Sequence, residues 1–132
     1  MLFKDAEAFS SFSVDDLAKA RAFYSEKLRL EVKEVPEGLE LHLSGGGTPV
    51  FVYLSSDYHA PEHTVLNFIV HDIDEAAKEL VKRGIKLEHY DLPDIKTDAD
   101  GILRNNGGGM GPRAIAWFKD PAEHILSIVQ KK

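Results

Sequence analysis

The chain has 132 residues, of which 43% are hydrophobic and 29% charged, so it can form one compact domain with an apolar core. Its formal net charge of −6, without a basic stripe, argues against nucleic acids, anionic membranes and polyanionic ligands as partners. It has no cysteine, which excludes disulfides, thiolate metal sites and a cysteine nucleophile. No signal peptide or membrane-spanning apolar run is evident, so we expect a cytoplasmic protein with no membrane partner.

Two stretches of the sequence, residues 12–20 and 68–76, resemble each other, and each is typical of a strand, an aspartate and a helix. In the first copy, Asp15 or Asp16 can cap the helix by accepting backbone hydrogen bonds. The apolar stripe of this helix consists of Leu17, Ala20, Phe23, Tyr24 and Leu28. Three further strands are predicted at residues 30–35, 39–43 and 50–54, and the second of them alternates strictly between leucine and a polar residue.

In the second copy, residues 64–70 predict a strand, and Asp72 followed by Glu75 predicts a capping box. The next helix ends at Gly84 and has apolar residues at the spacing of one buried face, namely Ile73, Ala76, Ala77, Leu80 and Val81. Strands are predicted at residues 85–90, 113–119 and 124–130. Between the first two of these, residues 91–112 form a long loop without a periodic pattern, which is either a lid over a site or simply a mobile loop.

The order strand–helix–three strands thus occurs twice, which predicts an α+β fold of two βαβββ modules in a single domain over residues 1–132. Module one spans about residues 6–56, module two about residues 63–130, and residues 57–62 are the linker. The pattern Phe12-x-Val14-x-Asp16-Leu17-x-x-Ala20-x-x-Phe23-Tyr24 and the closing segment 117–128, with Asp120-Pro121, resemble vicinal-oxygen-chelate proteins. That superfamily includes glyoxalase I, bleomycin-resistance proteins, extradiol dioxygenases and fosfomycin-resistance enzymes.

The resemblance implies that the modules form a curved mixed β-sheet around a small-molecule cavity, with the helices outside. It also implies where a divalent metal would bind, because family members hold it with His, Gln or Glu on the first and last strands of the modules. The matching positions here are Phe9, Val65 and Ser127, and at the fourth position only Tyr53 could donate. We therefore expect no cofactor. A divalent metal is not favoured, but it stays possible because Glu7 and His63 lie two residues upstream of two of these positions.

Glu40 and His42 are the candidate catalytic residues because they share one face of the alternating strand. If that face lines the cavity, they could act as an acid–base pair or orient a ligand; otherwise they meet solvent. The predicted ligand pocket comprises Phe9, Ser11, His42, Tyr53, Val65, Asn67, Arg113, Trp117 and Ser127.

The expected function is that of a glyoxalase/bleomycin-resistance-like small-molecule protein without the usual metal site, whose specific activity the sequence does not identify. One alternative is a metal-free protein that binds and sequesters a drug or metabolite. A second is a metal-dependent lyase or dioxygenase that uses unconventional ligands. Whether it is an enzyme is left open, with a lyase, isomerase or dioxygenase-like activity possible. The expected partners are a small organic molecule and a second copy of the chain, with the cavity either within one chain or between two.

Overall fold

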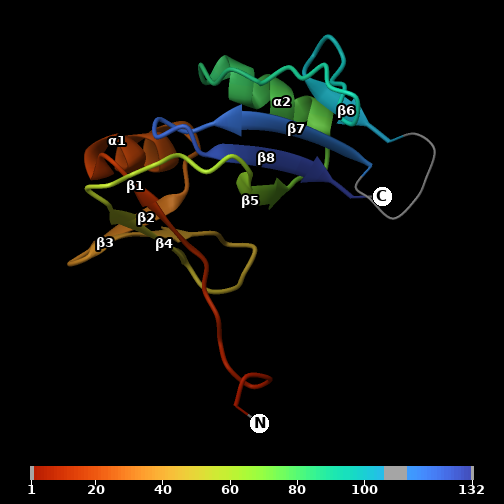
Figure 1. Ribbon diagram of the computed structural model, residues 1–132. Coiled ribbons are helices and arrows are strands. Elements are labelled where there is room, and N and C mark those ends of the chain that lie inside the picture. Colours follow the sequence, from red (N-terminus) through yellow and green to blue (C-terminus); the bar gives the residue numbers. More distant parts are fainter. Residues whose placement is uncertain (1, 106–112, 132) are drawn as a thin grey trace. The chain divides into compact units, whose positions relative to one another are not determined.

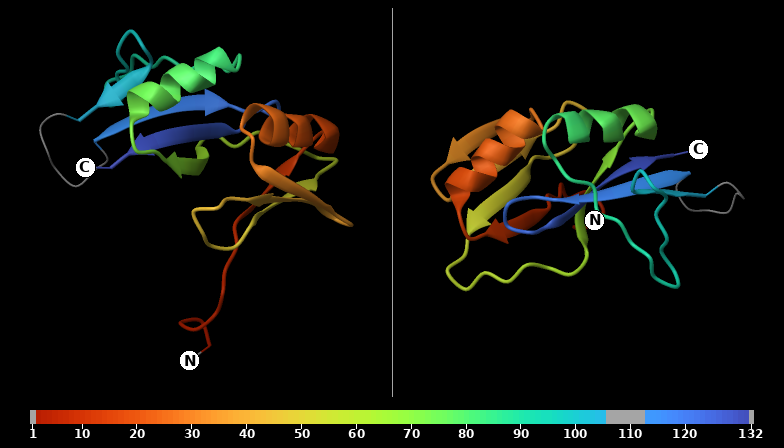
Figure 2. Two further views of the ribbon diagram at one scale, coloured as in Figure 1. Left: turned by 180° about the vertical axis from the view of Figure 1, so that it is seen from behind. Right: turned by 90° about the horizontal axis from the view of Figure 1, so that it is seen from above.

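The computed structural model describes residues 2–105 and 113–131, and the chain divides into two compact units, one ending at His59 and the other beginning at Ala60. In each unit, one helix lies against one face of a curved, open, four-stranded mixed sheet (Figure 1 and Figure 2). The predicted α+β class and the repeated βαβββ order are therefore confirmed.

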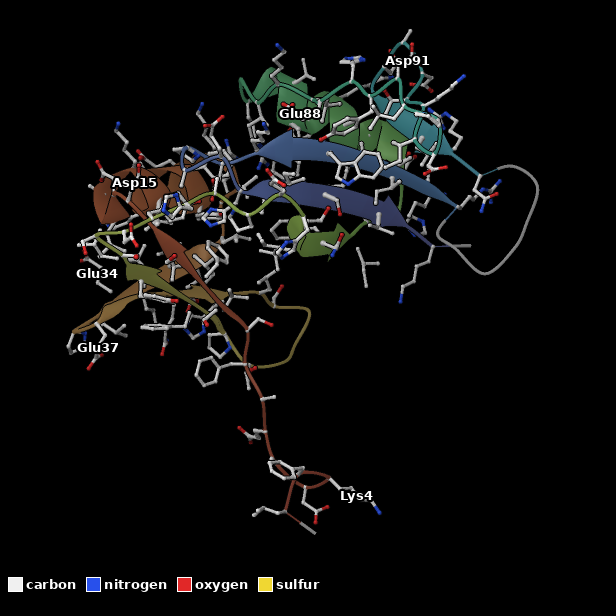
Figure 3. All side chains as sticks on the ribbon, in the orientation of Figure 1. Lys4, Asp15, Glu34, Glu37, Glu88 and Asp91 are labelled. Atoms are coloured by element: carbon white, nitrogen blue, oxygen red, sulfur yellow. The ribbon has the colours of Figure 1, made fainter. Side chains whose placement is uncertain are left out.

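The acidic side chains labelled in Figure 3 include four that are exposed, Asp15, Glu34, Glu37 and Asp91.

The first unit has a sheet of strand order β1-β4-β3-β2, in which only the β1–β4 pair is parallel. Its elements are β1 (Ser11–Val14), α1 (Leu17–Ala22), η1 (Phe23–Lys27), β2 (Glu31–Val35), β3 (Gly38–His42) and β4 (Val50–Leu54). Asp16 is the residue that caps α1, because its carboxylate accepts a hydrogen bond from the backbone N–H of Lys19 at 3.0 Å.

The π-helical turn η1 continues α1, and it explains how two adjacent aromatic residues are both buried. Leu28 N–H donates to the carbonyl of Phe23 at 3.0 Å, five residues back, so this turn is wider than an α-helical one. Phe23 and Tyr24 are 7% and 0% exposed, and their rings meet edge to face at 5.1 Å. The wider turn thus enlarges the apolar face that the helix presents to the sheet.

The second unit repeats this arrangement with the strand order β5-β8-β7-β6, in which only the β5–β8 pair is parallel. Its elements are β5 (Thr64–Ile69), α2 (Ile73–Lys82), β6 (Ile102–Arg104), β7 (Ala114–Lys119) and β8 (Ile125–Gln130). Asp72 caps α2 by accepting hydrogen bonds from the N–H groups of Asp74 and Glu75, and Gly84 follows the helix with a φ of 82°. No helix within the described ranges is long and apolar enough to cross a membrane.

The strand predicted at residues 85–90 is wrong, although the segment does lie beside β7. It makes one isolated bridge, between Leu87 and Phe118, and one further backbone hydrogen bond, from Glu88 N–H to the carbonyl of Trp117. The chain then leaves the edge of β7 and returns as β6, which pairs with the other end of the same strand. The predicted pattern-free loop 91–112 therefore contains a strand, while its glycine-rich part, residues 106–112, lies outside the described residues.

The turn between β7 and β8 has Glu123-His124 at its end, and a buried carboxylate organises it. One oxygen of Asp120 accepts the backbone N–H groups of Ala122 and His124 at 3.0 and 2.8 Å, and the other contacts Nδ1 of His124 at 2.8 Å. His124 is fully buried. Glu123 adopts a φ of 67°, a left-handed conformation that usually requires glycine. The Asp120 hydrogen bonds therefore hold a backbone shape that Glu123 alone would not favour.

We predict that Gly38→Ala destabilises the first unit by about 2 kcal/mol or more, because a Cβ at this position would lie 2.1 Å from the carbonyl oxygen of Val52. Gly45→Ala is the matched control, since a Cβ there meets nothing within 4 Å. Urea unfolding of the two variants measures the difference. Equal unfolding midpoints for both variants would contradict the prediction.

Candidate functional site

The two faces of the first sheet differ sharply in chemistry. On the face covered by α1, Leu39, Leu41 and Val52 are at most 3% exposed. The residues that alternate with the leucines of β3, Glu40 and His42, point to the opposite, open face and are half-buried. The predicted alternation of β3 is therefore confirmed, and it brings the two candidate catalytic side chains together on one surface.

The open face carries a row of four residues, one from each strand. The strand register places Ser11, Phe51, Glu40 and Lys33 directly opposite one another across β1, β4, β3 and β2. Residues that are opposite each other in this way project from the same face of a sheet. Tyr53, two residues after Phe51 on β4, lies parallel to it with ring centroids 5.8 Å apart and an interplanar angle of 18°. The centre of the open face is thus an aromatic stack next to a carboxylate.

A hollow of about 290 Å³ opens beside this stack, and we call it the aromatic depression. It is lined by Phe9, Glu40, Thr48, Pro49 and Phe51. Two contacts position the segment before β1 along its edge: the Thr48 hydroxyl donates to the carbonyl of Ala8, and Phe51 N–H donates to the carbonyl of Ser10 at 2.9 Å. Because these bonds lie on either side of Phe9 in the sequence, they hold that ring at the depression, where it is 66% exposed.

The Glu40 carboxylate is held from one side only. Its Oε1 lies 2.9 Å from Nε2 of His42, and within residues 2–105 and 113–131 no other partner of this carboxylate is found. A neutral imidazole must carry its proton on Nε2 to donate this hydrogen bond. Lys33, opposite Glu40 on β2, instead forms an ion pair with Glu31 at 3.5 Å. The second oxygen of Glu40 is therefore available to a ligand in the aromatic depression.

The second sheet also has a row on the face opposite its helix, formed by Asn67, Ser127 and Trp117. The Ser127 hydroxyl donates to Oδ1 of Asn67, and Ser127 is fully buried whereas Asn67 is exposed. The ring of Tyr90 meets Trp117 edge to face at 5.4 Å. Val65 lies at an irregularity in the pairing of β5 with β8.

Burial raises the pKa of the Tyr90 phenol, and the nearby Glu88 carboxylate raises it further. Tyr90 therefore stays a neutral hydrogen-bonding group over Trp117. Its backbone is fixed as well, because the Thr97 hydroxyl accepts its N–H at 2.9 Å.

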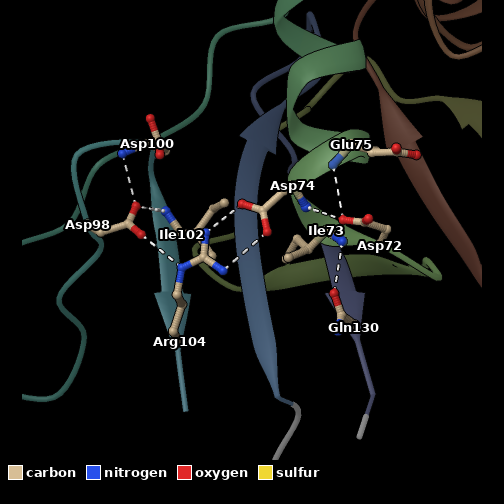
Figure 4. A network of polar contacts seen from close by, with 9 residues as sticks. All are labelled: Asp72, Ile73, Asp74, Glu75, Asp98, Asp100, Ile102, Arg104 and Gln130. Atoms are coloured by element: carbon tan, nitrogen blue, oxygen red, sulfur yellow. Dashed lines mark hydrogen bonds and ion pairs between the residues drawn. The ribbon is translucent and has the colours of Figure 1, made fainter. Parts of the chain in front are cut away.

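Arg113 is placed apart from Trp117, in a polar depression of about 370 Å³ at the start of α2. The residues that line it are His71, Asp72, Asp74, Arg104, Arg113, Ala114 and Gln130. The first N–H groups of α2 already have partners there, because Gln130 accepts that of Ile73 and Asp72 accepts the next two (Figure 4). The helix therefore offers no free N–H groups of the kind that bind anions at helix starts.

Arg104 links the polar depression to the segment before β6 through two carboxylates (Figure 4). Its guanidinium lies 2.6 Å from Asp74 and 3.1 Å from Asp98. The hydrogen bond from Arg104 lowers the pKa of Asp74. Burial acts to raise the pKa of Asp98, but hydrogen bonds from Ile102 N–H, Arg104 and Asp100 N–H outweigh it and hold that pKa below its usual value. Both carboxylates raise the pKa of Arg104.

The structure thus distributes the sequence-predicted site residues over three places. The first place is the open face of the first sheet, with Phe9, Ser11, Glu40, His42 and Tyr53. The second is the second sheet, with Val65, Asn67, Trp117 and Ser127. The third is the polar depression, which Arg113 lines. Sequence reasoning missed Phe51, Thr48 and Pro49. Phe51 could have been found from Tyr53, since residues two apart on one strand share a face.

Comparison with protein families shows which family the chain belongs to. Residues 10–128 match the model of the Glyoxalase/Bleomycin resistance protein/Dioxygenase superfamily. The chain belongs to this superfamily. No curated protein matches the chain significantly.

Several solved structures share the fold of this chain. A superfamily member from Sphaerobacter thermophilus DSM 20745 matches with a TM-score of 0.67 and 22% identity, over 96% of this chain and 98% of the other. A glyoxalase/bleomycin resistance protein/dioxygenase from Alicyclobacillus acidocaldarius gives 0.65 and 20%, over 99% and 95%. TnmS3, an antibiotic binding protein from Streptomyces sp. CB03234, gives 0.64 and 19%, over 97% and 98%. At these identities the similarity establishes the fold alone.

We predict that Arg104→Gln lowers stability at neutral pH and that this loss disappears in acid. The folded-state pKa values of Asp74 and Asp98 are lowered, so their contribution is fully present above the ordinary carboxyl pKa of about 4 and is lost as the pH falls through the lowered values. Urea midpoints of wild type and variant across this pH range measure the effect. Arg21→Gln, which removes an exposed ion pair to Glu34 at 3.8 Å, should change little at any pH. A loss in Arg104→Gln that does not depend on pH would rule out the electrostatic explanation.

Proposed function

We propose that this member of the glyoxalase superfamily binds a small planar organic molecule at the aromatic depression, without help from a divalent metal. The observation that carries the proposal is the parallel stack of Phe51 and Tyr53 beside a hollow of about 290 Å³. Exposed aromatic rings lose contact with water when a flat ligand covers them, and stacking adds to this gain. The volume is close to the lower end of the usual range for small-molecule sites, roughly 300 Å³, which suits a ligand of one or two rings.

The chemistry of the residues supports the metal-free part of the proposal. At the positions where the family resemblance places metal ligands, Phe9 and Val65 have no donor atom, and the buried Ser127 hydroxyl already donates to Asn67. Within the described ranges there is no group of three or more His, Cys, Asp or Glu residues that could hold a metal ion. Glu40 and His42 supply two donors, fewer than the three protein ligands of a typical catalytic zinc site. TnmS3, which shares the fold, is an antibiotic binding protein, a function that fits this kind of site.

We expect Phe51→Ala to weaken the binding of bicyclic aromatic compounds about tenfold, because one face of the stack is removed. Quinoline serves as the probe, and the backbone amide resonances of β3 and β4 follow its binding in an NMR titration. Phe3→Ala is the matched control, since Phe3 is 86% exposed and does not line the depression. Unchanged affinity in a folded Phe51→Ala protein would refute the proposed site.

Purified protein incubated with nickel, zinc, manganese or iron(II) and then dialysed should retain much less than one metal ion per chain, because the donor set is incomplete. Mass spectrometry of metal content measures this directly. Quinoline affinity should be the same with and without a chelator. Stoichiometric metal that survives dialysis would reverse the proposal and favour an enzyme with unconventional ligands.

A further inference from the structure

We infer that the aromatic depression selects organic cations, with Glu40 as the counter-ion of a positively charged ring. The inference rests on the proposed function and names the chemical class of its ligand. It goes beyond stacking, because a flat neutral compound and a flat cation of the same shape would use the same aromatic surface. What distinguishes them is the carboxylate in the lining of the hollow.

The position of Glu40 favours a cation over a neutral ligand. Glu40 lies directly opposite Phe51 across the β3–β4 pair, and both line the depression together with Phe9. A neutral ligand placed over Phe51 would remove water from the carboxylate without replacing the lost hydrogen bonds. A cationic ring would replace them with an ionic interaction, and the electron-rich faces of Phe9 and Phe51 would add cation–π attraction.

The charges on this face leave Glu40 unneutralised. Among the described residues, the charged or titratable groups beside it on this face of the sheet are Glu31 and Lys33 on β2 and His42 on β3. Lys33 and Glu31 form an ion pair with each other at 3.5 Å. Phe51, opposite Glu40 on β4, carries no charge. When His42 is neutral and donates its Nε2–H to Glu40, the Glu40–His42 pair has one net negative charge, which is located at the Glu40 carboxylate.

The hydrogen bond from His42 also holds the carboxylate in place. It engages Oε1 and leaves Oε2 as the oxygen that a ligand can reach. Glu40 and His42 side chains are 38% and 27% exposed, so both are partly shielded from water. An ionic interaction at such a half-buried position is screened less by salt than one on the open surface.

The test compares N-methylquinolinium, a flat cation, with quinoline, which has nearly the same shape and is uncharged at slightly alkaline pH. Calorimetric titration should give at least about tenfold tighter binding of the cation to the wild-type protein. Glu40→Gln should remove this preference, so that both compounds bind with similar, weak affinity. Glu37→Gln removes an exposed carboxylate outside the depression and should leave the preference unchanged.

A second readout needs no variant: in the wild-type protein the NMR resonance of the Glu40 side-chain carboxyl carbon should shift with N-methylquinolinium and much less with quinoline. Equal affinity for the two compounds overturns the charge selectivity, and a preference that persists in Glu40→Gln overturns the role of Glu40 as the counter-ion. Either result leaves the proposed aromatic site intact. If neither compound binds the wild-type protein, the proposed function fails, and the inference fails with it.

Discussion

Each sheet in this protein is covered by a helix on one face only, and this asymmetry determines where every other side chain of the sheet points. In the first unit, Leu41 and Val52 are fully buried on the face covered by α1. Since neighbouring residues of a strand project to opposite faces, Glu40 and Phe51 have to point away from the helix. A shift of one residue in β3 would place a carboxylate and an imidazole beneath α1, where the cost of desolvation would exceed any gain in packing. The hydrophobic core thus fixes the composition of the open face.

The elements that the sequence predicts well are those governed by such local rules. Alternation in β3, the aspartates that cap both helices and Gly84 at the end of α2 all depend on residues a few positions apart. The predicted strand at residues 85–90 failed because pairing is a long-range property: Leu87 and Glu88 occupy only one end of β7, and Ile102–Arg104 occupies the other. A segment such as residues 85–90, which alternates apolar and polar side chains, shows that a strand is possible, but it does not show which partner edge is free.

The site was predictable where it follows from the alternation of side chains between the two faces of a strand. Glu40 and His42 share a face in the sequence pattern and make contact at 2.9 Å in the structure. The position of Phe9 was not predictable in the same way, because it depends on bonds between segments some forty residues apart, such as the one from the Thr48 hydroxyl to Ala8. Glu123 shows a further limit: its left-handed backbone contradicts the residue preference and is explained only by the hydrogen bonds of the buried Asp120 carboxylate.

The polar depression and the aromatic depression differ less in volume than in whether their central polar groups already have partners. In the polar depression, of about 370 Å³, Arg104 binds two carboxylates, and the first N–H groups of α2 have acceptors. A ligand of Arg104 or of these N–H groups would have to break bonds before it could form its own. The aromatic depression is smaller, but its Glu40 carboxylate has one oxygen engaged by His42 and the other open to a ligand. Binding free energy is available where a polar group lacks a protein partner and apolar surface is still exposed, and both conditions meet at Glu40 and Phe51.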